Sequence, residues 1–239
     1  MWTPCPIVSL ISLLVGLILA FVGVIQLKMF GAEIYVSSLV AVSMTRIMGA
    51  IMTGIILAGR TGASYAAVIG TMQVNEEIDA LTTLGVAPSD YLIMPRVLAL
   101  TAMTPLLVLY SDFMGIMGGF IVGVGILGLD PMEYYTFTQK GFNINNLWVG
   151  MVHGAVYGML IAITGCYQGL RCGRNAEAVG KATTSAVVYS IVGIVLSTAV
   201  LTILCNIFEY MNTSTPIIEA RDLTSATAAT SCRRISTSQ

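Results

Sequence analysis

The sequence predicts an all-α integral membrane protein with about five transmembrane helices. Of its 239 residues, 56% are hydrophobic and 10% are charged, and the mean hydropathy is +0.86. A soluble domain usually carries about 25% charged residues, so a chain this apolar suits lipid better than water. Several segments also reach the roughly 20 apolar residues that a helix needs to cross a bilayer. The net charge of −1 gives no indication of nucleic-acid binding.

The predicted spans cover residues 7–27, 39–60, 97–127, 147–167 and 184–208. The third exceeds one crossing, so we expect it to be tilted, kinked near Pro105 or extended into water. Positive residues at the span ends predict the orientation, because cytoplasmic loops carry the excess of lysine and arginine. We therefore expect the N-terminus in the cytoplasm and the C-terminus outside. The cytoplasmic set is Arg60, Arg96, Arg171, Arg174 and Lys181, and the outer set is Lys28 and Lys140.

Small residues recur at steps of four in three predicted spans. Such residues lie on one helix face and allow two backbones to approach closely, which favours helix association in lipid. Glycine is also common in membrane helices in general, but three separate series favour close packing. The series are Ala50, Gly54, Ala58, Gly62, Ala66 and Gly70; Gly115, Gly119 and Gly123; and Gly150, Gly154, Gly158 and Ala162.

The cytoplasmic loop after the second span, residues 71–88, predicts a short amphipathic helix. Apolar residues recur there at helical spacing, acidic residues lie off that stripe, and Gly85 and Pro88 supply a stop signal. The helix could lie on the membrane surface, but such helices usually carry lysine or arginine. Residues 61–94 contain neither, so the acidic face suits a protein partner better. The apolar residues are Val74, Ile78, Leu81 and Leu84, and the acidic ones are Glu76, Glu77 and Asp79.

Residues 47–100 resemble the core of the MlaE permease family, the membrane subunits of ABC transporters that move lipids between bacterial membranes. Three segments together carry the resemblance: AGRTGA at 58–63, GTMQVNEEIDAL at 70–81, and the spacing from Pro88 to Pro95 and Arg96. The likeness extends over roughly residues 6–208. The second predicted span differs from the family pattern at one point. Members often show R-E-[LM]-G where this chain has Arg46-Ile47-Met48-Gly49, which weakens the transfer of lipid-contacting roles to that point.

The resemblance implies a homodimer in the bacterial inner membrane, with lipid as substrate, ABC ATPase subunits in the cytoplasm and MCE-domain proteins in the periplasm. It also implies that the helix at 72–84 is the coupling helix that docks on the ATPase, with Glu76, Glu77, Asp79 and Leu81 as contacts. Members usually begin with a cytoplasmic amphipathic helix, whereas here a span begins almost at Met1. We therefore expect that the chain is truncated or that its start is misassigned.

Arg46 and Asp112 lie inside predicted spans, where a charge costs roughly 2.5–3.5 kcal/mol unless it is paired or wetted. They could line a cavity for lipid headgroups, formed by the first, second and fifth spans. They could instead form a mutual ion pair or lie near wet ends. His153 has no nearby metal-ligating partners in sequence, so we expect a hydrogen-bonded packing role.

The sequence predicts a non-catalytic subunit with no cofactor and no metal site. It has no Walker motif, so a partner must hydrolyse ATP. Residues 123–128 match GxGxxG but follow no predicted strand. The five cysteines lack metal or disulfide spacing and are interpreted as apolar fillers. Two alternatives remain: an intramembrane lipid-modifying enzyme, which needs clustered His, Asp or Glu, and a secondary transporter, which predicts inverted repeats.

Beyond the third span, Asp130, Pro131 and Glu133 predict the start of a short periplasmic interfacial helix that ends near Lys140. Aromatic residues around it could anchor the chain at the membrane interface or contact an external partner. They are Tyr134, Tyr135, Phe137, Phe142 and Trp148.

The composition changes after residue 208, which divides a transmembrane domain, 1–208, from a tail, 209–239. The tail is rich in Ser, Thr and Ala and is expected to be disordered. Residues 211–224 also look like the opening of an ABC ATPase. The tail is therefore either an ordinary one with a chance match or the product of a reading-frame slip into a neighbouring ATPase gene.

Overall fold

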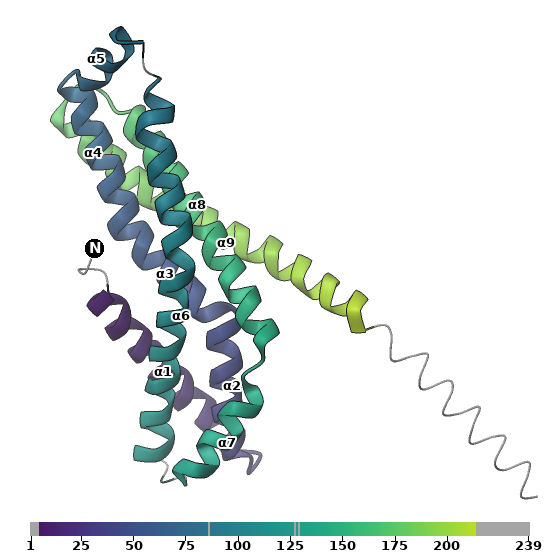
Figure 1. Cartoon of the computed structure of the whole chain (residues 1–239). Coiled ribbons are helices and arrows are strands. Elements are labelled where there is room, and N and C mark those ends of the chain that lie inside the picture. The colour runs from purple at the N-terminus through teal and green to yellow at the C-terminus, as the bar shows by residue number, and fades with distance from the viewer. Residues whose placement is uncertain (1–4, 86, 127, 129, 214–239) are drawn as a thin grey trace, which may run out of the picture. The chain divides into compact units, whose positions relative to one another are not determined.

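The computed structural model describes residues 5–85, 87–126, 128 and 130–213 (Figure 1). Every regular element in these residues is a helix, which confirms the predicted fold class. They include five helices long and apolar enough to cross a membrane, as predicted. These spans are Pro6–Lys28, Val36–Val74, Asp90–Gly125, Ile144–Leu170 and Ala176–Ile207. The tail lies outside the described residues from 214 onward.

The second span is longer than expected and is built from five consecutive helical pieces. The helix continues past the predicted end at Arg60, which lies within a π turn, as far as Val74. Arg46 lies in the other π turn of this span. Such turns insert an extra residue into a helix and are frequent at functional sites. The pieces are α2 (Val36–Ser43), η2 (Met44–Met48), α3 (Gly49–Leu57), η3 (Ala58–Gly62) and α4 (Ala63–Val74).

The other spans are simpler. The first is α1 (Cys5–Lys28), which is followed by the short 3-10 turn η1 (Glu33–Tyr35). The third joins the π turn η4 (Ser89–Ile93) to α6 (Met94–Gly125), and Pro105 lies within that one helix. The fourth is α8 (Ile144–Leu170). The fifth belongs to α9 (Ala176–Thr213), which continues past the predicted boundary at 208.

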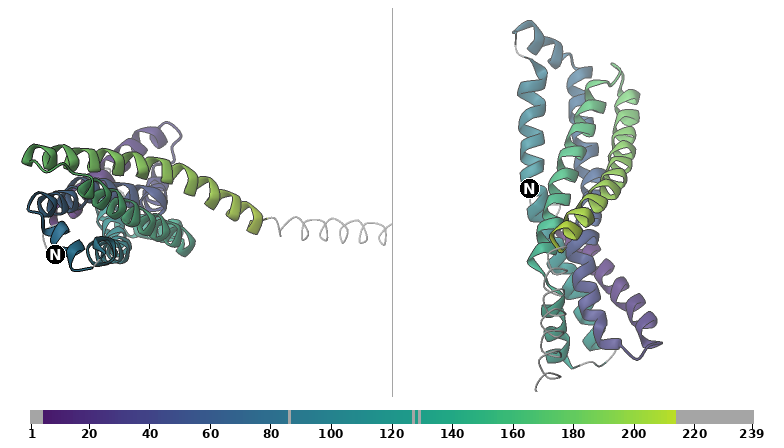
Figure 2. Two further views of the ribbon diagram at one scale, coloured as in Figure 1. Left: turned by 90° about the horizontal axis from the view of Figure 1, so that it is seen from above. Right: turned by 90° about the vertical axis from the view of Figure 1, so that its right-hand side faces the viewer.

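Two short helices lie outside the spans, at opposite ends of the second span (Figures 1 and 2). One is α5 (Glu77–Thr83), which follows α4, and the other is α7 (Pro131–Gly141), which packs on α2. Asp130 takes the predicted N-cap position with Pro131 in the first turn. Within the described residues, however, its side chain makes no capping hydrogen bond.

The described chain divides after Thr198 into two compact units. Within the first unit, α1 packs on α6, α6 packs on α8, and α4 packs on α8. The largest buried cluster joins α3, α6, α8 and α9 around Leu57, Val108, Tyr157 and Ile194. A second cluster joins α1, α2 and α6, and a third lies near α5.

Candidate functional site

The predicted coupling helix is divided in two by a tight turn. Residues 72–84 do not form one helix, because α4 ends at Val74 and α5 begins at Glu77. Glu76 between them has φ 60° and ψ 16°, a left-handed conformation that few residues other than glycine adopt. Gly85 at the other end of α5 is also left-handed, with φ 76°. The turn at Glu76 therefore sets the direction of α5 relative to α4, and the one at Gly85 turns the chain on toward η4.

Apolar contacts fix α5 to the end of the bundle. Ile78 is 7% exposed and belongs to a cluster with Ile69 and Leu92, and the partly buried Leu81 packs against the same cluster. Leu84, which the same stripe includes, is 77% exposed. The apolar stripe thus seats α5 through its middle and leaves its C-terminal end open.

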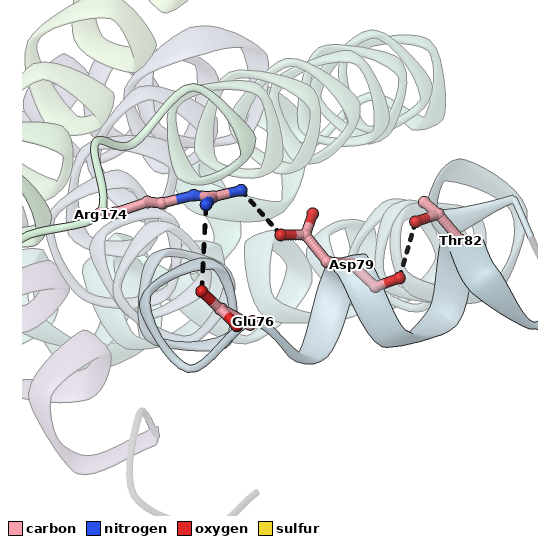
Figure 3. Close-up of polar contacts among 4 residues, drawn as sticks. All are labelled: Glu76, Asp79, Thr82 and Arg174. Atoms are coloured by element: carbon pink, nitrogen blue, oxygen red, sulfur yellow. Dashed lines mark hydrogen bonds and ion pairs between the residues drawn. The ribbon is translucent and has the colours of Figure 1, made fainter.

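The three acidic residues of this region have different surroundings, and Figure 3 shows two of them, Glu76 and Asp79, beside Arg174. Arg174, in the loop between α8 and α9, donates a 2.7 Å hydrogen bond from Nη2 to Oδ2 of Asp79. Its Nη1 lies 3.9 Å from Oε1 of Glu76. Glu77 accepts a long, 3.4 Å hydrogen bond from the amide of Asn75 and is exposed. The sequence places Arg174 on the same side as α5 but does not reveal this pairing, because the residues lie 95 positions apart.

The small residues expected to pack helices are buried at helix crossings. A Cβ added at Gly54 would lie 3.3 Å from the Tyr157 ring, and one at Gly62 would lie 3.1 Å from Ile161. Gly154 faces Val108 in the same way at 2.8 Å. The remaining members are Ala58, which is fully buried in the largest cluster, and three glycines with tight neighbours. Gly150 faces the Thr45 carbonyl, Gly158 faces Thr104, and Gly119 faces Val40.

At the crossing of α1 and α6, sequence reasoning named Gly115 but missed Gly16 and Gly118. Gly16 of α1 lies against the backbone of Gly115, and Gly118 of α6 lies against the Leu13 carbonyl. Gly165 of α8 approaches the Gly62 carbonyl closely as well, since an added Cβ would be 2.9 Å away. A lone glycine in α1 forms no series, so the step-of-four pattern could not identify it.

Asp112 is 3% exposed and lies between packed helices. Its Oδ1 atom is in contact with Gly49 of α3, and the neighbouring Ser111 shares a 2.7 Å hydrogen bond with Ser12 of α1. Within the described residues, neither carboxylate oxygen of Asp112 has a hydrogen-bond partner, so it makes no hydrogen bond with Arg46. Arg46 itself is partly buried. Their roles in a lipid cavity stay a prediction.

Two more buried polar residues share this part of the bundle. His153 donates from Nδ1 to the Val149 carbonyl at 2.7 Å and packs edge-on against Tyr157, in line with the expected hydrogen-bonded packing role. Its Nε2 and the hydroxyl of Thr53 have no hydrogen-bond partner among the described atoms. The core of the membrane region therefore holds several polar groups that the described chain leaves unsatisfied.

The aromatic residues near α7 divide into two groups. Tyr134 is buried against Gly123 and packs edge-on to Phe120, with ring centroids 5.5 Å apart. Burial raises the pKa of Tyr134 from 10.0 to about 12. Phe137 packs on Tyr35 and lies beneath the Lys140 ammonium. The exposed group comprises Tyr135, Phe142 and Trp148.

Comparison of the sequence with known proteins identifies the family of this chain. The sequence model described as Permease MlaE matches residues 1–204. A probable ABC transporter permease protein of Rickettsia typhi is 40% identical over 197 residues, which are 82% of this chain and 76% of that protein. The intermembrane phospholipid transport system permease protein MlaE of Haemophilus influenzae is 29% identical over 185 residues, 77% of this chain and 71% of that one. The chain therefore belongs to the MlaE permease family and is a multi-pass membrane permease subunit.

Proposed function

We propose that this chain is the transmembrane subunit of an ABC transporter that moves phospholipid or related lipids between bacterial membranes. A separate cytoplasmic ABC ATPase supplies the energy, and the chain itself is non-catalytic. It resides in the inner membrane with its N-terminus in the cytoplasm and its C-terminus in the periplasm. The membership of the MlaE permease family supports the transport class, and the Haemophilus relative is named for phospholipid transport.

The proposal that the chain contacts an ATPase rests on one observation, the way in which α5 is built. This seven-residue helix projects from the end of the second span, between two left-handed turns. Ile78 seats it, while Glu77 and Leu84 remain exposed. A short, seated helix with exposed acidic and apolar groups suits a protein partner that carries basic and apolar groups. Movement of that partner would be transmitted to α4 and α6, the spans on either side of the loop.

A second copy of the chain is the proposed partner within the membrane. Both α1 and the part of α9 up to Thr198 expose continuous apolar faces, which suit lipid or another protomer. Two copies would enclose a lipid cavity lined by the first, second and fifth spans, with Arg46 and Asp112 as its candidate polar residues. The exposed residues include Leu10, Leu14 and Ile18 of α1, and Val188, Val192 and Val195 of α9.

An MCE-domain protein is the proposed periplasmic partner, and α7 is its candidate contact. Buried Tyr134 fixes α7 to α6, while Met132 and Tyr135 are 75% and 61% exposed. A rigid helix with exposed apolar side chains provides either a membrane anchor or a docking surface. Removal of both side chains by Met132→Ser and Tyr135→Ser should weaken co-purification of the periplasmic partner if docking is its role.

The test of the proposed function is purification of the tagged chain with its co-expressed ATPase, followed by reconstitution into liposomes. We expect ATP-dependent transfer of a fluorescent phospholipid and phospholipid bound to the purified complex, identified by mass spectrometry. Transfer driven by an ion gradient without the ATPase would indicate a secondary transporter. Conversion of the lipid to a new product would indicate an intramembrane enzyme. Either result would overturn the proposal.

A further inference from the structure

We propose that Arg174 is a positioning residue that ties α5 to the start of α9, so that a displacement of α5 reaches the fifth span directly. The inference rests on the proposed role of α5 as the ATPase contact. The loop between α8 and α9 then takes part in coupling, because it passes the motion of α5 into the membrane.

The chain itself connects α5 to only two spans. On one side it joins α4 through the left-handed residue Glu76, and on the other it joins α6 through Gly85 and η4. The fifth span has no such connection. Arg174 precedes the first residue of α9, Ala176, by two positions, and its side chain reaches across to α5 (Figure 3). The ion pair is therefore a direct polar link between the loop helix and the base of α9.

The geometry of the link favours a defined orientation. The two terminal nitrogens of one guanidinium face two carboxylates, Asp79 at 2.7 Å and Glu76 at 3.9 Å. The planar arginine fork holds its donors in fixed directions, unlike the single ammonium of lysine. Asp79 lies within α5 and Glu76 immediately precedes it, so the contact fixes both the first turn of the helix and the left-handed turn that sets its direction.

The loop that carries Arg174 is itself held against the bundle. A Cβ added at Gly70 of α4 would lie 3.4 Å from Sγ of Cys172 and 3.4 Å from both γ carbons of Val179. The glycine thus allows both the loop and the first turn of α9 to pack closely on α4. The carbonyl of Asn175 then accepts the amide of Ala178 at 3.0 Å and begins α9. Because the loop backbone is packed on α4, the side chain of Arg174 is held within reach of α5.

The ion pair of Arg174 with Asp79 is partly exposed, so its contribution to the stability of the fold is small and its role in coupling can be measured separately. The side chains of Arg174 and Asp79 are 61% and 47% exposed, and exposed ion pairs contribute little to folding. Loss of the pair should therefore leave the permease folded. What it should change is the angle and the coupling of α5, and hence the amount of lipid moved per ATP hydrolysed.

The test compares Arg174→Ala, Asp79→Asn and the double variant in the reconstituted complex with its ATPase. Lys181→Ala is the matched control, because Lys181 forms an even more exposed ion pair with Glu177 that stays within α9. The readouts are ATPase co-purification, ATP hydrolysis and phospholipid transferred per ATP. We expect Arg174→Ala to retain the ATPase, and each single variant to lower lipid per ATP by about two- to fivefold, the range of a weak charge pair. The double variant should be no worse than either single one, because both remove the same contact.

The charge exchange Arg174→Asp with Asp79→Arg should restore much of the lost coupling, whereas Arg174→Asp alone should lower it further. Lipid per ATP in Arg174→Ala equal to that of Lys181→Ala would overturn the inference, and so would additive effects in the double variant. Loss of the ATPase from the Arg174→Ala complex would also overturn it, since Arg174 would then be a docking contact. Failure of the wild-type chain to bind an ATPase at all would instead overturn the proposed function.

Discussion

The carboxylate of Asp112 lies against Gly49, and within the described residues neither of its oxygens has a hydrogen-bond partner. A buried polar group without a partner costs free energy, and folding alone gives no reason to retain it. We therefore predict that Asp112→Asn keeps thermal stability at or above that of the wild type while it lowers lipid transport severalfold. The melting temperature of the purified protein and transport in liposomes measure the two effects.

The contact also makes a prediction for Gly49. A methyl group there would overlap the Asp112 carboxylate, so Gly49→Ala should destabilise the bundle. Combination with Asp112→Ala, which creates space, should recover part of the lost stability. If Asp112→Asn lowers the melting temperature as strongly as Gly49→Ala does, then Asp112 has a structural partner, such as bound water, and the functional interpretation is wrong.

Gly154 provides a test of close helix packing. An added Cβ would lie 2.8 Å from Cγ2 of Val108 on α6, so Gly154→Leu should push α6 and α8 apart. Overpacking of a buried contact costs about 1–3 kcal/mol, and the larger side chain should reach the upper part of that range. Gly193→Leu is the control, because an added Cβ there meets nothing within 4 Å among the described atoms. Equal melting temperatures for the two variants would show that the α6–α8 contact tolerates a larger side chain.

The sequence was sufficient to predict the helices but not all of their ends. Apolar runs long enough to cross a bilayer predict the five spans, and Asp130 with Pro131 predicts the start of α7. The charge of Arg60 predicts the end of the second span, but the helix extends past it. No helix-stopping signal follows Arg60, and the small and apolar residues that continue to Val74 keep the helix intact.

The contacts of the candidate site were less predictable than its location. The acidic loop was identified from its pattern, but the left-handed turn at Glu76 was not, since glutamate has no preference for that conformation. The pairing of Asp79 with Arg174 depends on how α4 and α8 pack, which no local pattern encodes. For the same reason, the serine pair Ser12 and Ser111 between α1 and α6 emerges only from the three-dimensional structure.

The buried phenol of Tyr134 predicts a dependence of stability on alkaline pH. Burial raises its pKa from 10.0 to about 12, so the folded state holds the phenolic proton more tightly than the unfolded state does. The resulting stability is fully present below about pH 10 and is lost as the pH rises through about 12. Tyr134→Phe keeps the ring against Gly123 but removes the proton. We expect its melting temperature to fall less between pH 10 and 12 than that of the wild type. Tyr135→Phe, at an exposed ring, is the control and should behave as the wild type does.

The acidic residues of α5 should have separable effects on the proposed ATPase contact. Glu77 is exposed and touches only Asn75 through a long hydrogen bond among the described side-chain contacts, so Glu77→Lys reverses charge on the outer surface alone. Asp79→Lys also places a positive charge against Arg174. We predict that Glu77→Lys weakens ATPase co-purification by about five- to tenfold without changing the melting temperature of the permease, as expected for a charge reversed at a complementary interface.

Asp79→Lys should retain more of the ATPase but transfer less lipid per ATP, and the double variant should lose both binding and transport. Glu177→Lys, on α9 away from α5, controls for the change in net charge. Unchanged ATPase binding and transport in the double variant would show that α5 is not the coupling helix.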